Sequence, residues 1–106
     1  MYPYGWIKES GTPPLPHWDC ILITGNKEGF LPGDEAEIKV IGVYRRADGD
    51  HKYVVVESHR PVEDIGELSE DELSELLRLY PNISEGEGWF GKETAKNCML
   101  HDEKAL

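Results

Sequence analysis

The strongest constraint on the fold lies in the stretch from Leu31 to Glu57, which has the pattern of two β-strands joined at a charged turn. Polar and apolar residues alternate from Glu35 to Val40, as they do in a strand that is buried on one face only. After this segment the apolar residues resume out of phase, so the sequence predicts a β-bulge at Ile41-Gly42. A second, β-branched strand is predicted over Lys52–Val56.

The turn between these strands, Asp48-Gly49-Asp50, places acidic side chains at the end of a rigid pair of strands. Asp-Gly and Gly-Asp pairs supply the positive φ angle that a tight turn needs. Because residues two apart share one face of a strand, Asp50 and Lys52 are expected to point the same way. Such a pair could hold a hard cation and a phosphate oxygen side by side. The alternative is a solvated turn whose charges serve only solubility.

Composition limits the classes of partner. The chain has 106 residues, which favours a single domain over residues 1–106. Its 21 acidic residues exceed its 11 basic ones, and the net charge of −10 repels nucleic acid and anionic membranes, so neither is an expected partner. The two cysteines, Cys20 and Cys98, are far apart, and no signal-like or membrane-spanning apolar segment is present. A cytoplasmic protein with reduced thiols is therefore expected.

Outside the central stretch, the sequence predicts one more strand, an irregular entry and two helices. Trp18–Thr24 is almost continuously apolar and predicts a buried strand, in which the carboxylate of Asp19 needs a cap or a cation. Residues 1–17 end in a proline cluster and are expected to be packed but irregular. A helix is predicted over residues 69–80, where Ser69 and Glu72 match a capping box, and a weaker helix over 92–100.

Two further segments show no period. Residues 58–68 contain Pro61 and Gly66 and are expected to form a long surface connection. Trp89 and Phe90 are expected to anchor the loop that follows the first helix. The three tryptophans and Cys20 are expected in the core.

Eight short motifs are spread over most of the chain. In order, they are Tyr4-Gly5-Trp6-Ile7, Trp18-Asp19-Cys20-Ile21-Leu22-Ile23, Leu31-Pro32-Gly33-Asp34, Ile41-Gly42-Val43, Asp48-Gly49-Asp50-His51-Lys52, Glu63-Asp64-Ile65-Gly66-Glu67-Leu68, Leu79-Tyr80 and Gly88-Trp89. Together they resemble the motifs of the soluble, family I inorganic pyrophosphatases.

The resemblance implies an α+β fold that is mainly β with flanking helices, in the form of a truncated OB-like barrel. It implies Mg²⁺-dependent hydrolysis of diphosphate to two phosphates at the mouth of that barrel. By position, the metal-binding residues are Asp19, Asp48 and Asp50, of which Asp19 and Asp50 are also catalytic, and the residues that bind diphosphate or phosphate are Tyr4, Lys52 and Tyr80. A homo-oligomer is expected, because a shortened barrel exposes sheet edges that a partner usually covers.

The chain also departs from the family pattern. Pro14 and Pro16 occupy the positions of two metal-binding aspartates, Pro81 occupies that of a lysine, and the family's earlier strands, with further charged site residues, would lie before Met1. Because one electrostatic group in such a site is commonly worth roughly 2.7–4 kcal/mol of barrier, weak or lost hydrolysis is expected. The alternative is a non-enzymatic phosphate-binding, metal-binding or oligomerisation module. It stays open whether the lost aspartates are replaced by Glu35, Glu37 or Glu87.

Overall fold

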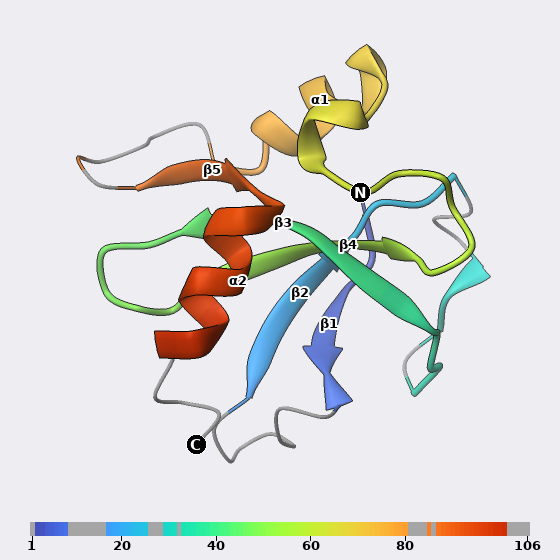
Figure 1. Ribbon diagram of the computed structural model, residues 1–106. Coiled ribbons are helices and arrows are strands. Elements are labelled where there is room, and N and C mark those ends of the chain that lie inside the picture. The colour runs from blue at the N-terminus through green and yellow to red at the C-terminus, as the bar shows by residue number, and fades with distance from the viewer. Residues whose placement is uncertain are drawn as a thin grey trace.

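The computed structural model describes residues 2–8, 17–25, 29–31, 33–80, 85 and 87–101 (Figure 1). The elements in chain order are β1 (Tyr4–Ile7), β2 (Trp18–Leu22), β3 (Ile38–Arg45), β4 (Lys52–Glu57), the short 3-10 helix η3 (Ile65–Glu67), α1 (Glu70–Leu77), β5 (Gly88–Gly91) and α2 (Lys92–His101). The α+β class predicted from the sequence is confirmed.

The five strands form one mixed sheet in the order β1-β2-β4-β3-β5. β1 is antiparallel to β2, β2 is parallel to β4, and β3 is antiparallel to both β4 and β5. Among the described strands the sheet is open rather than closed into a barrel. No helix in the described part of the chain is long and apolar enough to cross a bilayer.

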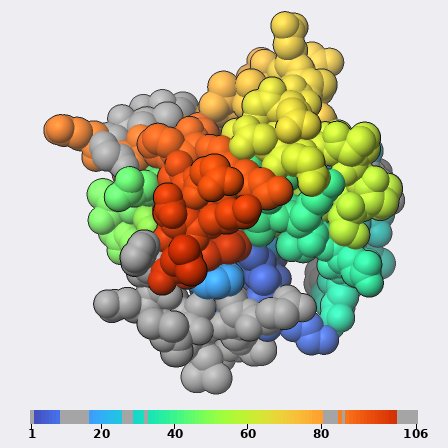
Figure 2. All heavy atoms as spheres, in the orientation of Figure 1, coloured from blue at the N-terminus to red at the C-terminus, as the bar shows by residue number. Residues whose placement is uncertain are grey.

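Both faces of the sheet are covered by apolar side chains. The α1-side cluster joins sheet residues such as Ile21 and Val54 to Val62, Leu68 and Leu76, which come from the segment around η3 and from α1. The α2-side cluster joins the remaining buried residues of the central strands to α2; its members are Cys20, Leu22, Val43, Tyr53, Val55 and Ala95. In the space-filling view, α2 covers the middle of this second face (Figure 2). Burial on both faces explains why β4 is apolar almost without interruption.

The predicted bulge is confirmed. Val40 of β3 is paired with Val55 of β4, and the next pair is Gly42 with Val54, so Ile41 is the extra residue. As a result, Ile41 and Gly42 both lie on the α1 side, and Val43 returns to the α2-side cluster. Gly42 is needed at this point because a Cβ there would lie 2.7 Å from the backbone oxygen of Phe90.

The capping box of the first helix is also confirmed. The Ser69 side chain accepts a hydrogen bond from the backbone N–H of Glu72, and the Glu72 side chain accepts one from the backbone N–H of Ser69. α1 nevertheless ends at Leu77, before the predicted end at Tyr80. The prolines at 14, 16 and 81, with the predicted extended loop over 11–16, lie outside the described residues.

Several sequence predictions are wrong. The entry over residues 1–17 contains a strand, β1, and Trp6 on it is exposed rather than in the core. Trp89 and Phe90 lie in strand β5 and pair with β3 instead of anchoring a loop. The connection over 58–68 buries Val62 and Leu68 and is therefore part of the core. Both missed strands are short and contain glycine, so pairing with a distant neighbour, rather than local pattern, makes them strands.

Cys20 lies in the core, as predicted. Burial, with a smaller contribution from the charge of Asp19, raises the pKa of its thiol to about 11. The thiol therefore stays protonated near neutral pH and behaves as a small apolar group.

The carboxylate of Asp64 accepts hydrogen bonds from backbone N–H groups of two helices, η3 and α2. Its Oδ2 accepts a hydrogen bond from the Gly66 N–H at 2.9 Å, and its Oδ1 accepts one from the Lys92 N–H, at the start of α2, at 2.8 Å. Gly91 permits this approach, because a Cβ at that position would lie 2.7 Å from Oδ1. The donation from Lys92, and then that from Gly66, lowers the pKa of Asp64.

We predict that Asp64→Asn lowers the free energy of unfolding by about 1–2 kcal/mol at neutral pH, because an amide is neutral and accepts through one atom only. The pKa of Asp64 is depressed in the folded state, so the stabilisation is present above the pKa of the unfolded chain and is lost as the pH falls through the folded value. The difference between wild type and variant should therefore shrink in acid. Denaturant unfolding at several pH values tests this.

The control is Glu37→Gln, which removes the same charge from an exposed position and should change stability by less than about 0.5 kcal/mol. An Asp64→Asn effect that is the same at neutral and acid pH would contradict the capping role.

Candidate functional site

One row of side chains crosses all five strands on the α1 side of the sheet. The paired positions are Trp6 with Asp19, Asp19 with Lys52, Lys52 with Tyr44, and Tyr44 with Trp89. Residues directly opposite each other on neighbouring strands share a face of the sheet. These five side chains are therefore neighbours in space, although they are far apart in the sequence. Lys52 stands in the middle of the row because β4 is the central strand.

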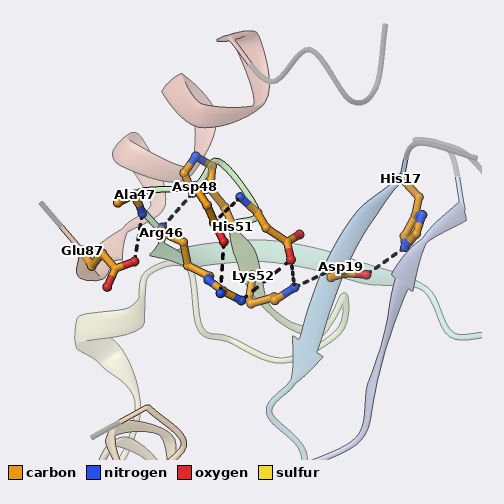
Figure 3. A network of polar contacts seen from close by, with 9 residues as sticks. His17, Asp19, Arg46, Ala47, Asp48, His51, Lys52 and Glu87 are labelled. Carbon is orange, nitrogen blue, oxygen red and sulfur yellow. Dashed lines mark hydrogen bonds and ion pairs between the residues drawn. The ribbon is translucent and has the colours of Figure 1, made fainter. Parts of the chain in front are cut away.

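The Lys52 ammonium is almost completely buried, with 7% of its side chain exposed. Its Nζ donates to Asp19 Oδ2 at 2.8 Å and to Asp50 Oδ2 at 2.9 Å (Figure 3). Burial alone would lower the pKa of Lys52, but the hydrogen bonds to Asp19 and Asp50, with a further contribution from Tyr4, raise it. The lysine is therefore charged at any physiological pH, and the prediction that Asp50 and Lys52 point the same way is confirmed.

Two basic side chains extend this arrangement (Figure 3). His17 Nε2 lies 2.9 Å from Asp19 Oδ1. Arg46 places one nitrogen 3.1 Å from Asp48 Oδ2 and another 3.8 Å from Asp50 Oδ2. We call these six residues the Lys52 network: His17, Asp19, Arg46, Asp48, Asp50 and Lys52.

The turn that carries Asp48 and Asp50 is stabilised by side chains that accept hydrogen bonds from its backbone N–H groups. Gly49 has a φ of +83°, as the sequence predicts, and Asp48 Oδ1 accepts a hydrogen bond from the Asp50 N–H at 2.9 Å. His51 Nδ1 accepts one from the Arg46 N–H at 2.9 Å, and Glu87 Oε2 accepts one from the Ala47 N–H at 3.0 Å. His51 and Glu87 thus brace the turn.

The three predicted metal-binding aspartates are not equivalent. Asp19 and Asp50 surround a single cation position, which the Lys52 ammonium fills, while Asp48 is turned towards Arg46. Within the described ranges, no three His, Cys, Asp or Glu side chains are grouped so that they could hold a metal ion. Two carboxylates together with phosphate oxygens are nevertheless a common way of binding Mg²⁺. In this structure Asp19 and Asp50 are bridged by the Lys52 ammonium.

The glutamates considered as substitutes lie elsewhere. Glu35 pairs with Lys8 at 3.1 Å, and Glu87 caps the turn as described above. Glu37 is exposed in the segment that precedes β3.

The predicted phosphate-binding residues Tyr4, Lys52 and Tyr80 are brought together. The Lys52 Nζ lies 5.8 Å from the centroid of the Tyr4 ring. Tyr4 and Tyr80 line one hollow of about 240 Å³ together with Tyr2, Ile21 and Leu79. The Tyr4 hydroxyl is hydrogen-bonded to the Lys52 side chain.

Arg46, His17 and Tyr44 were not predicted to belong to the site. Arg46 stands two and four positions before the acidic residues of the turn, and His17 stands two positions before Asp19, so local spacing carried a weak signal. Tyr44 enters the site only through its pairing with Lys52 and Trp89, which is a property of the folded sheet.

No protein-family model matches this chain, and neither does any curated protein.

We predict that Lys52→Met lowers the free energy of unfolding by about 3 kcal/mol, because the partly buried carboxylate of Asp19 loses the ammonium that faces it. Asp19→Asn should destabilise more than Asp50→Asn, since their side chains are 17% and 38% exposed. Denaturant unfolding measures all three.

The matched control is Lys96→Met, which removes an exposed ammonium that lies 3.8 Å from Glu93 and should have almost no effect. Equal losses for Lys52→Met and Lys96→Met would show that the buried network does not stabilise the fold.

Proposed function

We propose that this chain is a pyrophosphatase-like domain that binds diphosphate or phosphate together with Mg²⁺ around Lys52, and that it hydrolyses diphosphate weakly or not at all. The observation that carries the proposal is the convergence of Tyr4, Asp19, Asp50, Lys52 and Tyr80, which come from separate parts of the chain. All five residues lie in the motifs that resemble those of the family I inorganic pyrophosphatases.

We also propose that the sheet is a truncated OB-like barrel. Lys8, which follows the edge strand β1, pairs with Glu35 just before β3, although two strands separate β1 from β3 in the sheet. Ile7 of β1 and Ile38 of β3 also pack against the same α2-side cluster. Because the edge strand β1 approaches β3, the sheet is curled, and a sheet must curl to form a barrel.

The charges of the network favour a metal-bound anion over a bare one. Three carboxylates face Lys52 and Arg46, so one negative charge remains in excess and repels free phosphate. A divalent cation between Asp19 and Asp50 would displace the Lys52 ammonium from these carboxylates and reverse that sign, and the displaced ammonium could then bind a phosphate oxygen. Diphosphate that carries Mg²⁺ is therefore the ligand we propose.

The same groups explain why hydrolysis should be slow. Metal-dependent hydrolysis of a phosphoric anhydride needs ions that both activate water and stabilise the leaving phosphate. Two carboxylates suffice to hold one Mg²⁺ with its phosphate ligand, and in the described ranges no third ligand is grouped with them. Binding without efficient turnover follows from that ligand count.

We predict that methylenediphosphonate, which cannot be hydrolysed, binds the native protein in the presence of Mg²⁺ and binds Asp50→Asn about tenfold more weakly. Asp50 is the most suitable position because it is the more exposed of the two carboxylates on Lys52. Calorimetry measures the binding, and phosphate release from diphosphate measures any turnover.

Glu37→Gln is the charge-matched control and should bind as the native protein does. If the native protein binds no diphosphonate, or binds it as tightly after Asp50→Asn, the proposal is wrong.

A second candidate function is self-association through β1. Among the described strands β1 lies at one edge of the sheet, and Tyr4 and Trp6 on it are 57% and 47% exposed. Its four residues carry no charge, so two copies could pair there with less repulsion than elsewhere on a chain with a net charge of −10.

We predict that the native protein forms a concentration-dependent dimer and that Trp6→Glu abolishes it, because the substitution places a like charge on both copies. Sedimentation velocity measures the molecular mass. Phe90→Glu, on the opposite edge strand, is the control and should leave the dimer intact. A native monomer at all concentrations would rule out this second function.

A further inference from the structure

The geometry points to a particular class of ligand for this site: a phosphate ester with an aromatic group, whose ring lies in the tyrosine-lined hollow and whose phosphate lies at Lys52. This inference rests on the proposed function, because it adds a second contact to the same phosphate-binding site. Inorganic diphosphate would use only the polar part of the surface.

The hollow is the first reason. Its walls are formed by Tyr2, Tyr4, Ile21, Leu79 and Tyr80, none of which is charged. The hydroxyl of Tyr2 interacts with the Glu75 carboxylate of α1, so the side chain has a polar partner other than a ligand. The volume of about 240 Å³ is sufficient for one aromatic ring, since a cavity of about 150 Å³ can bind benzene. A hydrated diphosphate has no apolar surface that could match these walls.

The second reason is that one wall is held in place before any ligand arrives. The ring of Tyr80 is stacked on that of Tyr44, with 4.3 Å between the centroids and 16° between the planes. Tyr44 is buried and is itself stacked on Trp89 at 4.8 Å. A ring that enters the hollow therefore meets a rigid aromatic surface, and little conformational entropy is lost on binding.

The third reason is that Tyr4 belongs to both parts of the site. Its ring lines the hollow, and the Lys52 ammonium lies 5.8 Å from the ring centroid. The Tyr4 hydroxyl is hydrogen-bonded to the Lys52 side chain, and because an ammonium can only donate, the hydroxyl proton remains available for a phosphate oxygen. A ligand that fills the hollow and reaches Lys52 thus needs a ring and a phosphate joined directly or by a short link.

The test compares three ligands in the presence of Mg²⁺: phenyl phosphate, methyl phosphate and inorganic phosphate. We expect phenyl phosphate to bind at least about tenfold more tightly than methyl phosphate, because only its ring can contact the tyrosines. The preference should persist in Tyr80→Phe, which keeps the ring, and should disappear in Tyr80→Leu. Phe90→Leu, which removes an aromatic ring on another strand, is the control and should bind as the native protein does.

A measurement without any substitution guards against a variant that fails to fold. Magnetisation transfer in NMR should link the phenyl protons of the bound ligand to the methyl groups of Ile21 and Leu79 in the native protein. Its absence, with phenyl phosphate bound, would overturn the inference.

Three other results are decisive. Equal affinities for phenyl and methyl phosphate would overturn the inference and leave the proposed function intact. Failure of every phosphate and of methylenediphosphonate to bind would overturn both. Benzylammonium is the charge-reversed probe, and tighter binding of benzylammonium than of phenyl phosphate would show that the acidic surroundings make the hollow a cation site instead.

Discussion

A buried ammonium group at the centre of the sheet is the constraint on which the site depends. Lys52 lies on the middle strand and is nearly inaccessible to water, so its charge requires partners within hydrogen-bonding distance. Asp19 supplies one because β2 and β4 are parallel in a register that places the two residues side by side. Asp50 supplies the other because the turn ends two residues before Lys52. The need to pair the buried Lys52 charge therefore links the register of β2 and β4 to the conformation of the turn that carries Asp50.

The rest of the structure places these strands correctly. Because of the extra residue at Ile41, Ile41 and Val43 lie on opposite faces of the sheet, each within an apolar cluster. Asp64 accepts hydrogen bonds at the start of η3 and of α2, and so connects the segments that cover opposite faces. Tyr44 and Trp89 continue the row of side chains beyond Lys52 and support Tyr80 from behind. Polar and aromatic parts of the site are therefore positioned by the same five-stranded framework.

Local features of this fold could be predicted from the sequence, and features that depend on distant pairing could not. The change of phase at Ile41 and the capping box at Ser69 involve neighbouring residues, and both were predicted. β1 and β5 were missed because each becomes a strand only by pairing with another segment. For the site, the resemblance implied Asp19, Asp48 and Asp50 as metal-binding residues and Lys52 as a phosphate-binding residue. In the structure, Lys52 fills the position between the carboxylates of Asp19 and Asp50, while Asp48 is turned towards Arg46. This arrangement depends on burial and side-chain geometry, which cannot be deduced from the spacing of residues in the sequence.

We propose that Mg²⁺ and a diphosphate engage the carboxylates and the ammonium of the Lys52 network. The most direct measurement is NMR of the lysine side chains during titration with Mg²⁺ and methylenediphosphonate. We expect the signals of the Lys52 side chain to shift and saturate, and those of the exposed Lys96 to stay unchanged. A Lys52 signal that does not move at saturating ligand, or one that moves no more than that of Lys96, would contradict it.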